Sequence, residues 1–494
     1  MKEDAHQNAP ILESLVAHQR SEAHGFHVPG HKSGSAIDAD AVELYKNILS
    51  VDLTEIPGLD DLHHPEEAIL EAQKLAADCF GAEETFFLVG GSTVGNIAMI
   101  AAACRRGDLL LVQRDVHKSV LHGLMLAGVR TVFLTPQWDR LTGLSHGVDP
   151  GTVASALHSY PEAKGLLVTN PSYYGVSRGL VPLAELLHGQ GKLLLVDEAH
   201  GAHFGFHDEL PQSAMAAGAD ASVQSTHKML TAMTMGAMLH VQGALLDRVA
   251  LRKVLAMLQS SSPSYPILGS LDWSRRLMAL SGTERLEKVL QQANRVDVYV
   301  NSQKRWVVNR ASSALGGSQD RLKMVLADGE GNLDGFQLKS ALENQGIYPE
   351  MADPRYVLLA LGIGTTSEDI TALIEALQDL TELKSQISPN RHTIALMPSS
   401  PSGLQVTSDP LLMDWEEAVH GNAADRRRLV PVAECAGYRA AEMIVPYPPG
   451  IPLLYPGERI TREQADYLGS LAALGSRFHG HDVSGLGTVP VRKE

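Results

Sequence analysis

Short apolar runs alternate with helical segments along the first half of this chain, and this alternation limits the fold more than any other feature. The runs Thr85–Val89, Leu109–Val112, Gly165–Thr169 and Lys192–Val196 each have the length of a buried strand. Helical segments lie between them, for example from Pro182 to His188. Strands that alternate with helices build a mostly parallel sheet with helices on both faces. The sequence therefore predicts an α/β fold with a doubly wound sheet.

Polar residues follow two of the predicted strands, and the C-terminal ends of strands are where such a sheet binds its ligands. Asp197 directly follows the run Lys192–Val196. His227 and Lys228 follow Ser222–Thr226, which has the length of another strand. Taken singly, Lys228 could be a solvated surface lysine and Asp197 a helix cap. Together, and behind a glycine-rich turn, they favour a bound cofactor.

The turn is Gly90-Gly-Ser-Thr93, between a strand and a helical run from Val94 to Cys104. Its glycines let the backbone approach an anion, Ser92 and Thr93 add hydroxyls, and the helix N-terminus adds free N–H groups. Pyridoxal phosphate needs such a phosphate site, a lysine for covalent attachment and a carboxylate for its pyridinium nitrogen. We therefore predict that the chain binds pyridoxal phosphate.

Composition narrows the classes of partner and compartment. The 494 residues are 44% hydrophobic and 20% charged, as in a soluble protein of two or three domains. A net charge of −16 without a long basic run makes nucleic acid and anionic membranes poor partners. Cys79, Cys104 and Cys435 lack CxxC spacing, so we expect neither disulfides nor a metal site. Because signal-peptide and membrane-span patterns are missing, we expect a cytoplasmic protein.

Breaks in the strand and helix pattern suggest four segments. The first is an irregular arm that contains the loop Gly25–Gly34, and a helix is expected to start at Pro65. The last follows a linker at Pro398–Gly403 and contains a proline-rich ribbon, Val445–Glu458, which we expect to be stiff and extended. The predicted segments are the arm, a cofactor-binding large domain, a small α+β domain and a C-terminal domain, at residues 1–50, 51–308, 309–390 and 391–494.

Six motifs in order resemble those of a known family. The chain is similar to the Orn/Lys/Arg decarboxylases, which are fold-type I pyridoxal-phosphate enzymes with an aspartate aminotransferase-like fold. It is most similar to the short members of Gram-positive bacteria, which lack an N-terminal wing domain. The resemblance therefore implies a homodimer, or a doubled homodimer, with active sites at the subunit interface. The motifs are Phe26–Lys32, Gly90–Thr93, Val116–Ser119, Asp197–His200, Ser225–Lys228 and Pro446–Pro452.

The resemblance also implies roles for individual residues. Lys228 would attach the cofactor, and Asp197 would pair with its pyridinium nitrogen. His117 would stack on the ring, with Ala199 against the other face, although a histidine at this position also suits a cap of its own helix. His227 would donate the proton to the α-carbon, with Lys228 as the other donor. The remaining cofactor-binding residues implied are Ser92, Thr93, His200, Ser225 and, from a neighbouring subunit, Ser270.

The basic end of such a substrate needs a carboxylate partner, because an unpaired buried charge is costly. Glu442 and Glu458 flank the proline-rich ribbon, and both could instead be solvated. We expect Glu442 to read the distal cation, with Glu458 or the loop Asp60-Asp61 as the next candidates.

The implied activity is decarboxylation of arginine or lysine, and less readily of ornithine, to a polyamine-type amine. An aminotransferase of the same fold is the first alternative, although no arginine stands in a motif position to hold the α-carboxylate. A catalytically silent binding or assembly module is the second alternative.

Overall fold

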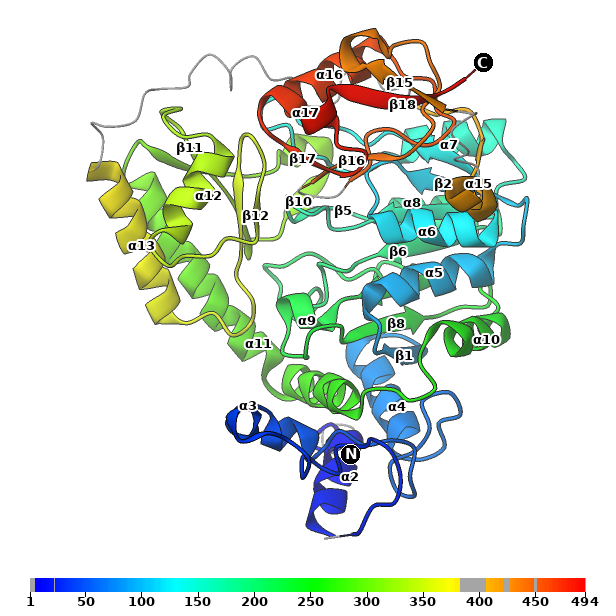
Figure 1. Ribbon diagram of the computed structural model, residues 1–494, viewed down its shortest axis with the longest axis vertical. Helices are drawn as coiled ribbons and strands as arrows, with labels where there is room; N and C mark the ends of the chain where they lie inside the picture. The colour runs from blue at the N-terminus through cyan, green and yellow to red at the C-terminus, as the bar shows by residue number, and fades with distance from the viewer. Residues whose placement is uncertain (1–4, 22, 383–405, 421–426, 448–450, 494) are drawn as a thin grey trace. The chain divides into compact units, whose positions relative to one another are not determined.

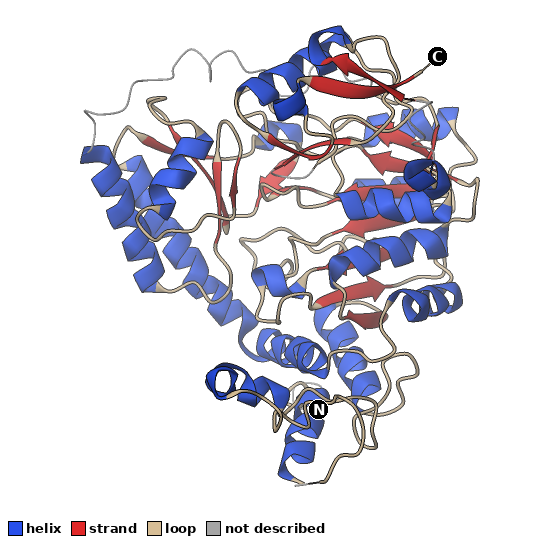
Figure 2. Ribbon diagram, viewed as in Figure 1, coloured by secondary structure: helices blue, strands red, loops and turns tan. Residues whose placement is uncertain are grey.

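The computed structural model describes residues 5–21, 23–382, 406–420, 427–447 and 451–493. It is an α/β fold with a mixed, mostly parallel large sheet, which confirms the predicted fold class (Figure 2). Among the described residues, no helix is both long and apolar enough to cross a membrane. The chain divides into two compact units, one of Met1–Ala103 with Leu193–Leu286 and one of Cys104–Lys192 with Glu287–Glu494.

The first unit contributes four strands to the large sheet, in the order β1-β8-β7-β6. Figure 1 labels β1, β8 and β6. β6 and β7 are parallel, whereas β8 is antiparallel to both β7 and β1. Nearly every residue of these strands is buried because both faces of the sheet are covered. The strands are β1 (Glu84–Leu88), β6 (Leu193–Asp197), β7 (Ala221–Gln224) and β8 (Ala237–Val241).

The N-terminal arm is not irregular as predicted, because it contains two helices. α2 buries Ile11 and Leu15. Its first turn is stabilised by the Ile11 N–H, which donates to Asp272 Oδ2 at 2.9 Å. The predicted loop Gly25–Gly34 separates it from α3. The helices of this unit are α2 (Pro10–Arg20), α3 (Ala39–Leu49), α4 (Ala68–Phe80), α5 (Gly91–Ala103), α9 (Thr226–Met229), α10 (Arg248–Leu258) and the start of α11 (Tyr265–Asn301).

α4 starts at Ala68 rather than at Pro65. Its start is stabilised by Asp60, which lies outside the helix. The carboxylate of Asp60 accepts the N–H groups of Glu66, Glu67 and Ile69 at 2.9–3.0 Å. These bonds stabilise the first turn and lower the pKa of Asp60, although its partial burial acts in the opposite direction. Asp60 is therefore a helix cap.

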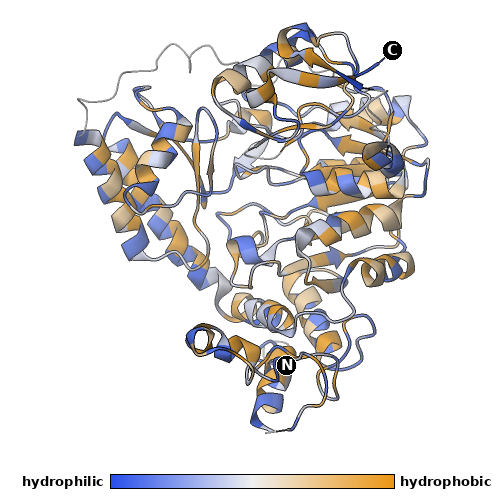
Figure 3. Ribbon diagram, viewed as in Figure 1, coloured by the Kyte–Doolittle hydropathy of each residue, from blue (hydrophilic) through white to orange (hydrophobic). Residues whose placement is uncertain are grey.

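The second unit contributes the strand order β4-β2-β3-β14. β2 is parallel to both of its neighbours, and β14 adds an antiparallel edge. β2 is buried along its whole length, and the strands of the large sheet are coloured mainly hydrophobic in Figure 3. The elements are β2 (Leu109–Gln113), α6 (Lys118–Ala127), β3 (Arg130–Leu134), α7 (Pro150–Ser159), β4 (Gly165–Thr169), β5 (Val176–Arg178), α8 (Val181–His188) and β14 (Leu411–Leu412).

A smaller antiparallel sheet in the same unit has the order β12-β13-β11-β9. Its helices make it the α+β element expected from the sequence pattern, and β10 pairs separately with β5. The elements are β9 (Trp306–Asn309), β10 (Gly317–Gln319), β11 (Lys323–Asp328), α12 (Gly335–Glu343), β12 (Met351–Ala352), β13 (Val357–Ala360) and α13 (Ser367–Glu382).

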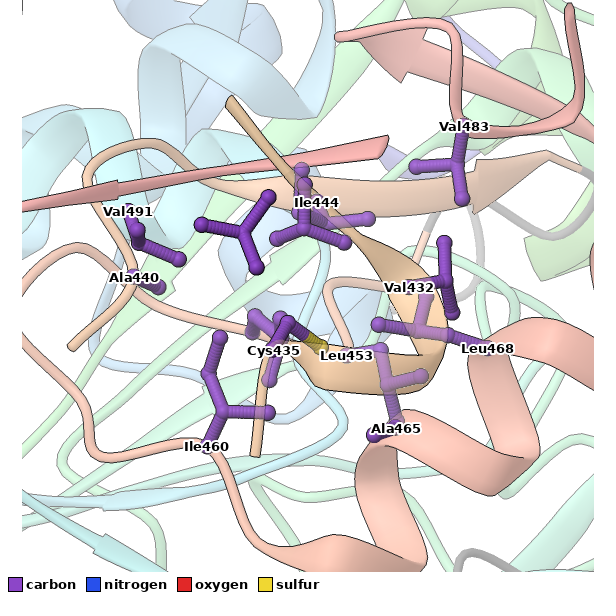
Figure 4. Packing of buried hydrophobic residues seen from close by; sticks show 13 residues of the cluster. Val432, Cys435, Ala440, Ile444, Leu453, Ile460, Ala465, Leu468, Val483 and Val491 are labelled. Carbon is purple, nitrogen blue, oxygen red and sulfur yellow. The ribbon is translucent and has the colours of Figure 1, made fainter. Parts of the chain in front are cut away.

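The C-terminal part has its own hydrophobic cluster, which includes Val432, Cys435, Ile444, Leu453 and Leu468 (Figure 4). Two pairs of antiparallel strands, β15 with β18 and β16 with β17, contribute residues to it. The elements are α15 (Trp415–His420), β15 (Arg427–Pro431), β16 (Ile444–Tyr447), α16 (Arg462–Ala473), β17 (Arg477–Gly480), α17 (Val483–Leu486) and β18 (Thr488–Arg492).

The proline-rich ribbon does not follow one extended path, contrary to the prediction. Ile444 pairs with Leu454, and the Leu453 N–H donates to Ile444 O at 2.9 Å, so the chain turns back on itself. The predicted linker Pro398–Gly403 lies outside the described residues.

Candidate active site

Asp197 lies at the C-terminal end of β6, as the sequence predicts, and its side chain is buried. Asn96 Nδ2 donates to Asp197 Oδ2 at 2.8 Å, and the Ala199 N–H donates to Asp197 Oδ1 at 3.1 Å. Two donors on different oxygens fix the plane of the carboxylate. A carboxylate held in this way can accept a further N–H from a cationic ring.

Lys228 lies in the short helix α9, because β7 ends at Gln224 and not at Thr226 as predicted. Its side chain is exposed, and its Nζ lies 3.0 Å from His200 Nε2. An ammonium can only donate, so the imidazole nitrogen accepts in this bond. His200 is therefore placed to take a proton from Lys228, which leaves the amine that covalent attachment requires.

The glycine-rich turn leads directly into α5, which begins at Gly91 with a left-handed φ of 75°. Ser92 and Thr93 thus occupy the first turn of the helix, where N–H groups lack partners within the helix. The hydroxyls of Ser92 and Ser225 lie 2.8 Å apart, which joins this turn to the end of β7. Hydroxyls and helix-terminal amides together form a phosphate site.

These groups fit pyridoxal phosphate. The ends of β6 and β7 are parallel neighbours, and the Ser225 N–H donates to Ala199 O at 3.3 Å. The first unit therefore brings a candidate anion site, an exposed lysine and a buried carboxylate to adjoining segments. Such a donor set holds the phosphate, the aldehyde carbon and the pyridinium nitrogen of that cofactor. The side chain of Ala199 is buried. Its contact with the ring of the cofactor stays a prediction.

His227 is held by a single carbonyl. Its Nδ1 donates to Gly236 O at 3.0 Å, and its backbone N–H donates to the same oxygen at 3.1 Å. Burial, with a contribution from the Lys228 charge, lowers the pKa of His227, although the bond to Gly236 opposes this shift. At neutral pH the ring is therefore mostly uncharged, with its proton on Nδ1 and a lone pair on Nε2.

Glu198 faces a buried network that the sequence does not reveal. Its carboxyl accepts the Ala214 N–H at 2.8 Å, Gln224 Nε2 at 2.8 Å and the Ser222 hydroxyl at 3.1 Å. Gln224 Oε1 in turn accepts from His240 Nε2 at 3.1 Å. Burial raises the pKa of Glu198 to about 8 and lowers the pKa of His240 to about 3. Asp197 therefore stands beside a carboxyl that is mostly neutral at pH 7.

His117 belongs to the second unit and caps α6. Its Nδ1 accepts the Ser119 N–H at 3.2 Å and lies 2.8 Å from the Ser119 hydroxyl. The cap fixes the ring orientation while leaving the ring half-buried. The role of His117 in ring stacking stays a prediction.

Ser270 is fully buried, and its hydroxyl is occupied within its own chain. It donates to Ile267 O at 2.7 Å and accepts the Met233 N–H at 3.0 Å. The role of Ser270 as a phosphate ligand in a neighbouring subunit stays a prediction.

The two candidate acids for the substrate both carry arginine partners. Glu442 pairs with Arg427, and both side chains are partly exposed. Glu458 lies 2.6 Å from Arg114 Nη2, with only 14% and 6% of the two side chains exposed. The side chain of Glu442 is 20% exposed, and its role in binding the distal cation stays a prediction.

Sequence patterns missed Asn96 and Arg114. Asn96 follows Ser92 by four residues, so both lie on one face of α5. A buried polar residue on an otherwise apolar helix is the signal that could have identified it. Arg114 adjoins a motif but carries no pattern of its own.

Comparisons with known proteins agree with this geometry. Models described as "Orn/Lys/Arg decarboxylase, major domain" and "Orn/Lys/Arg decarboxylase, C-terminal domain" match residues 9–328 and 406–492. An uncharacterized protein of Bacillus subtilis, YaaO, is 39% identical, covering 96% of each chain. The arginine decarboxylase of B. subtilis is 35% identical, covering 98% of each chain. Lysine decarboxylase A from Pseudomonas aeruginosa has a TM-score of 0.83 at 23% identity, covering 99% of this chain and 81% of that chain, which is a likeness of fold.

Proposed function

The chain belongs to the Orn/Lys/Arg decarboxylase family, and we propose that it removes CO₂ from L-arginine, with L-lysine second and L-ornithine third. The product would be a polyamine-type amine. The observation that carries this proposal is the grouping of Asp197, Lys228 and the Ser92–Ser225 pair at adjoining strand ends. The relative named arginine decarboxylase supports arginine as the first choice.

The cofactor of the reaction is pyridoxal phosphate, which supplies covalent attachment of the substrate amine and an electron sink for the bond to the leaving CO₂. Lys228 would attach it, with His200 accepting the lysine proton. Asp197, oriented by Asn96, would keep a ring nitrogen protonated by pairing with it. Ser92, Thr93 and Ser225 would bind the phosphate.

The overall reaction consumes one proton, because the α-carbon gains a hydrogen in place of the carboxylate. His227 would take up a proton at Nε2, since Nδ1 is committed to Gly236, and deliver it to that carbon. The lowered pKa of His227 favours release over retention of this proton. Lys228 is the second donor at the same segment.

We also propose that Glu442 reads the distal cation of the substrate. Its side chain is 20% exposed and pairs with Arg427, whose side chain is 41% exposed. An arginine in so open a position can give way to a substrate guanidinium, since exposed ion pairs contribute little stability.

A homodimer is the assembly that we propose. Against the residues that the structure describes, α3 buries none of its side chains, and Leu44 and Tyr45 are 75% and 50% exposed. Phe26, in the preceding loop, is 97% exposed. An apolar helix face of this kind favours a second copy of the chain as its cover.

The three cysteines form no disulfide, which supports a reducing compartment such as the cytoplasm.

A substrate panel tests the function. The purified protein, loaded with pyridoxal phosphate, is incubated separately with arginine, lysine and ornithine, while agmatine, cadaverine, putrescine and CO₂ are measured. Agmatine and CO₂ in equal amounts, with the highest kcat/KM for arginine, support the proposal. Keto acids without CO₂ would instead indicate an aminotransferase. Absence of both products would indicate a silent module.

A further inference from the structure

Arg114 follows the last residue of β2 and precedes His117 by three positions. Its side chain is buried and reaches into the C-terminal domain of the same unit. Arg114 Nη2 lies 2.6 Å from the Glu458 carboxylate and donates to Leu453 O at 3.1 Å. A charge buried with both an ion-pair partner and a carbonyl acceptor is held in one geometry.

Tyr455 adds two further contacts to the same residue. Its ring lies under the Arg114 guanidinium, with Cζ 4.8 Å from the ring centroid. Its hydroxyl donates to the backbone carbonyl of Arg114. The Tyr455 N–H also donates to Glu458 Oε2 at 3.1 Å, and the ring stacks on Phe133 of β3 at 4.0 Å. The side chain and the backbone of Arg114 are therefore both fixed by residues 453–458.

The segment between Arg114 and His117 has little freedom of its own. The Arg114 N–H donates to Leu134 O at 2.8 Å, and Val116 is fully buried. His117 then caps α6 through Ser119. Loss of the contacts at Arg114 would leave one end of this four-residue segment held only by the sheet.

We propose that Arg114, Glu458 and Tyr455 are positioning residues, through which the C-terminal domain holds the strand-end segment 114–117 and thereby His117. The consequence for cofactor binding rests on the proposed function, whereas the mechanical part does not. Glu458 is then a partner of Arg114 in this role and is not free to read a substrate cation.

Hydrogen exchange in the cofactor-free full-length protein tests the mechanical part. Glu458→Gln should speed exchange of the backbone amides of residues 114–120 by about tenfold or more, while the core of the C-terminal domain around Ile444 stays protected. Asp466→Asn is the matched control, because it removes one negative charge from the exposed pair with Arg462 on α16. It should leave residues 114–120 at the wild-type rate.

The same variant should bind pyridoxal phosphate several-fold more weakly and shift the circular dichroism of the bound cofactor. If Glu458→Gln speeds exchange in the whole C-terminal core, the same exchange measurement on Tyr455→Phe decides between the outcomes. That variant removes only the hydroxyl that donates to Arg114. Faster exchange at 114–120 with an intact core supports the proposal. Wild-type exchange there overturns it, whatever the substrate panel gives. Faster exchange in a protein without decarboxylase activity would uphold the positioning role and reject only the proposed function.

Discussion

Replacing Glu198 with glutamine should make thermal stability less dependent on pH. The wild-type carboxyl is buried, and its pKa is raised from 4.5 to about 8. The folded state therefore keeps a proton that the unfolded state has already released, and stability falls as the pH rises from 4.5 to about 8. Glutamine cannot ionise, so this loss should vanish in the variant.

The size of the effect follows from those two pKa values. Between pH 5.5 and pH 8.5 the linkage relation gives a loss of about 3 kcal/mol for this one group. An unfolding entropy of about 2.1 cal/mol/K per residue gives about 1 kcal/mol/K for the whole chain. The wild-type Tm should therefore fall about 3 °C further than that of Glu198→Gln over this range. The variant should also lose about 1 kcal/mol at every pH, because its amide has a single oxygen and cannot accept from both Ala214 and Gln224.

The assay is differential scanning calorimetry of the cofactor-free proteins across this pH range. Glu71→Gln, at an exposed position on α4, is the matched control and should follow the wild type. Curves of Tm against pH that run parallel for the wild type and Glu198→Gln would refute the reasoning.

Three further predictions concern the site itself. Lys228→Ala should retain the fold and abolish turnover, and borohydride reduction should no longer add the mass of the cofactor; a covalent adduct would contradict the assignment. Asp197→Asn should lower kcat by about a hundredfold or more, since losing one partner of a buried ion pair costs about 3 kcal/mol; a change of only a few-fold would make Asp197 structural. Glu442→Gln should raise KM for arginine well before kcat falls, whereas Arg427→Gln should not raise it; an unchanged KM in Glu442→Gln would exclude Glu442.

The sequence was sufficient to predict the fold class and the strand-end position of Asp197. Strand length and the placement of ligands at strand ends are local rules, and they hold here. Lys228 was predicted to follow a strand that ends at Thr226. It lies instead in the short helix α9, where the Lys228 N–H donates to Ser225 O.

Contacts between distant residues were beyond the sequence. The start of α4 depends on Asp60, which reaches its amides from outside the helix. The path of the ribbon depends on the pairing of Ile444 with Leu454, which overrides the stiffness expected from its prolines. The side chains of Asn96 and Arg114 contact Asp197 and Glu458, which lie 101 and 344 positions away in the sequence.

Asp197 and Glu198, at the end of β6, also disfavour an incorrect strand register. Leu193 to Val196 are apolar on both faces of the sheet, so hydrophobic alternation cannot distinguish the native pairing from a slip by one residue. Such a slip would turn every side chain to the opposite face. It would carry Asp197, which pairs opposite Val223, away from Asn96, and Glu198 away from Gln224 and Ser222. A misregistered strand would then bury polar groups without partners, so the residues of the candidate site also favour the native strand pairing.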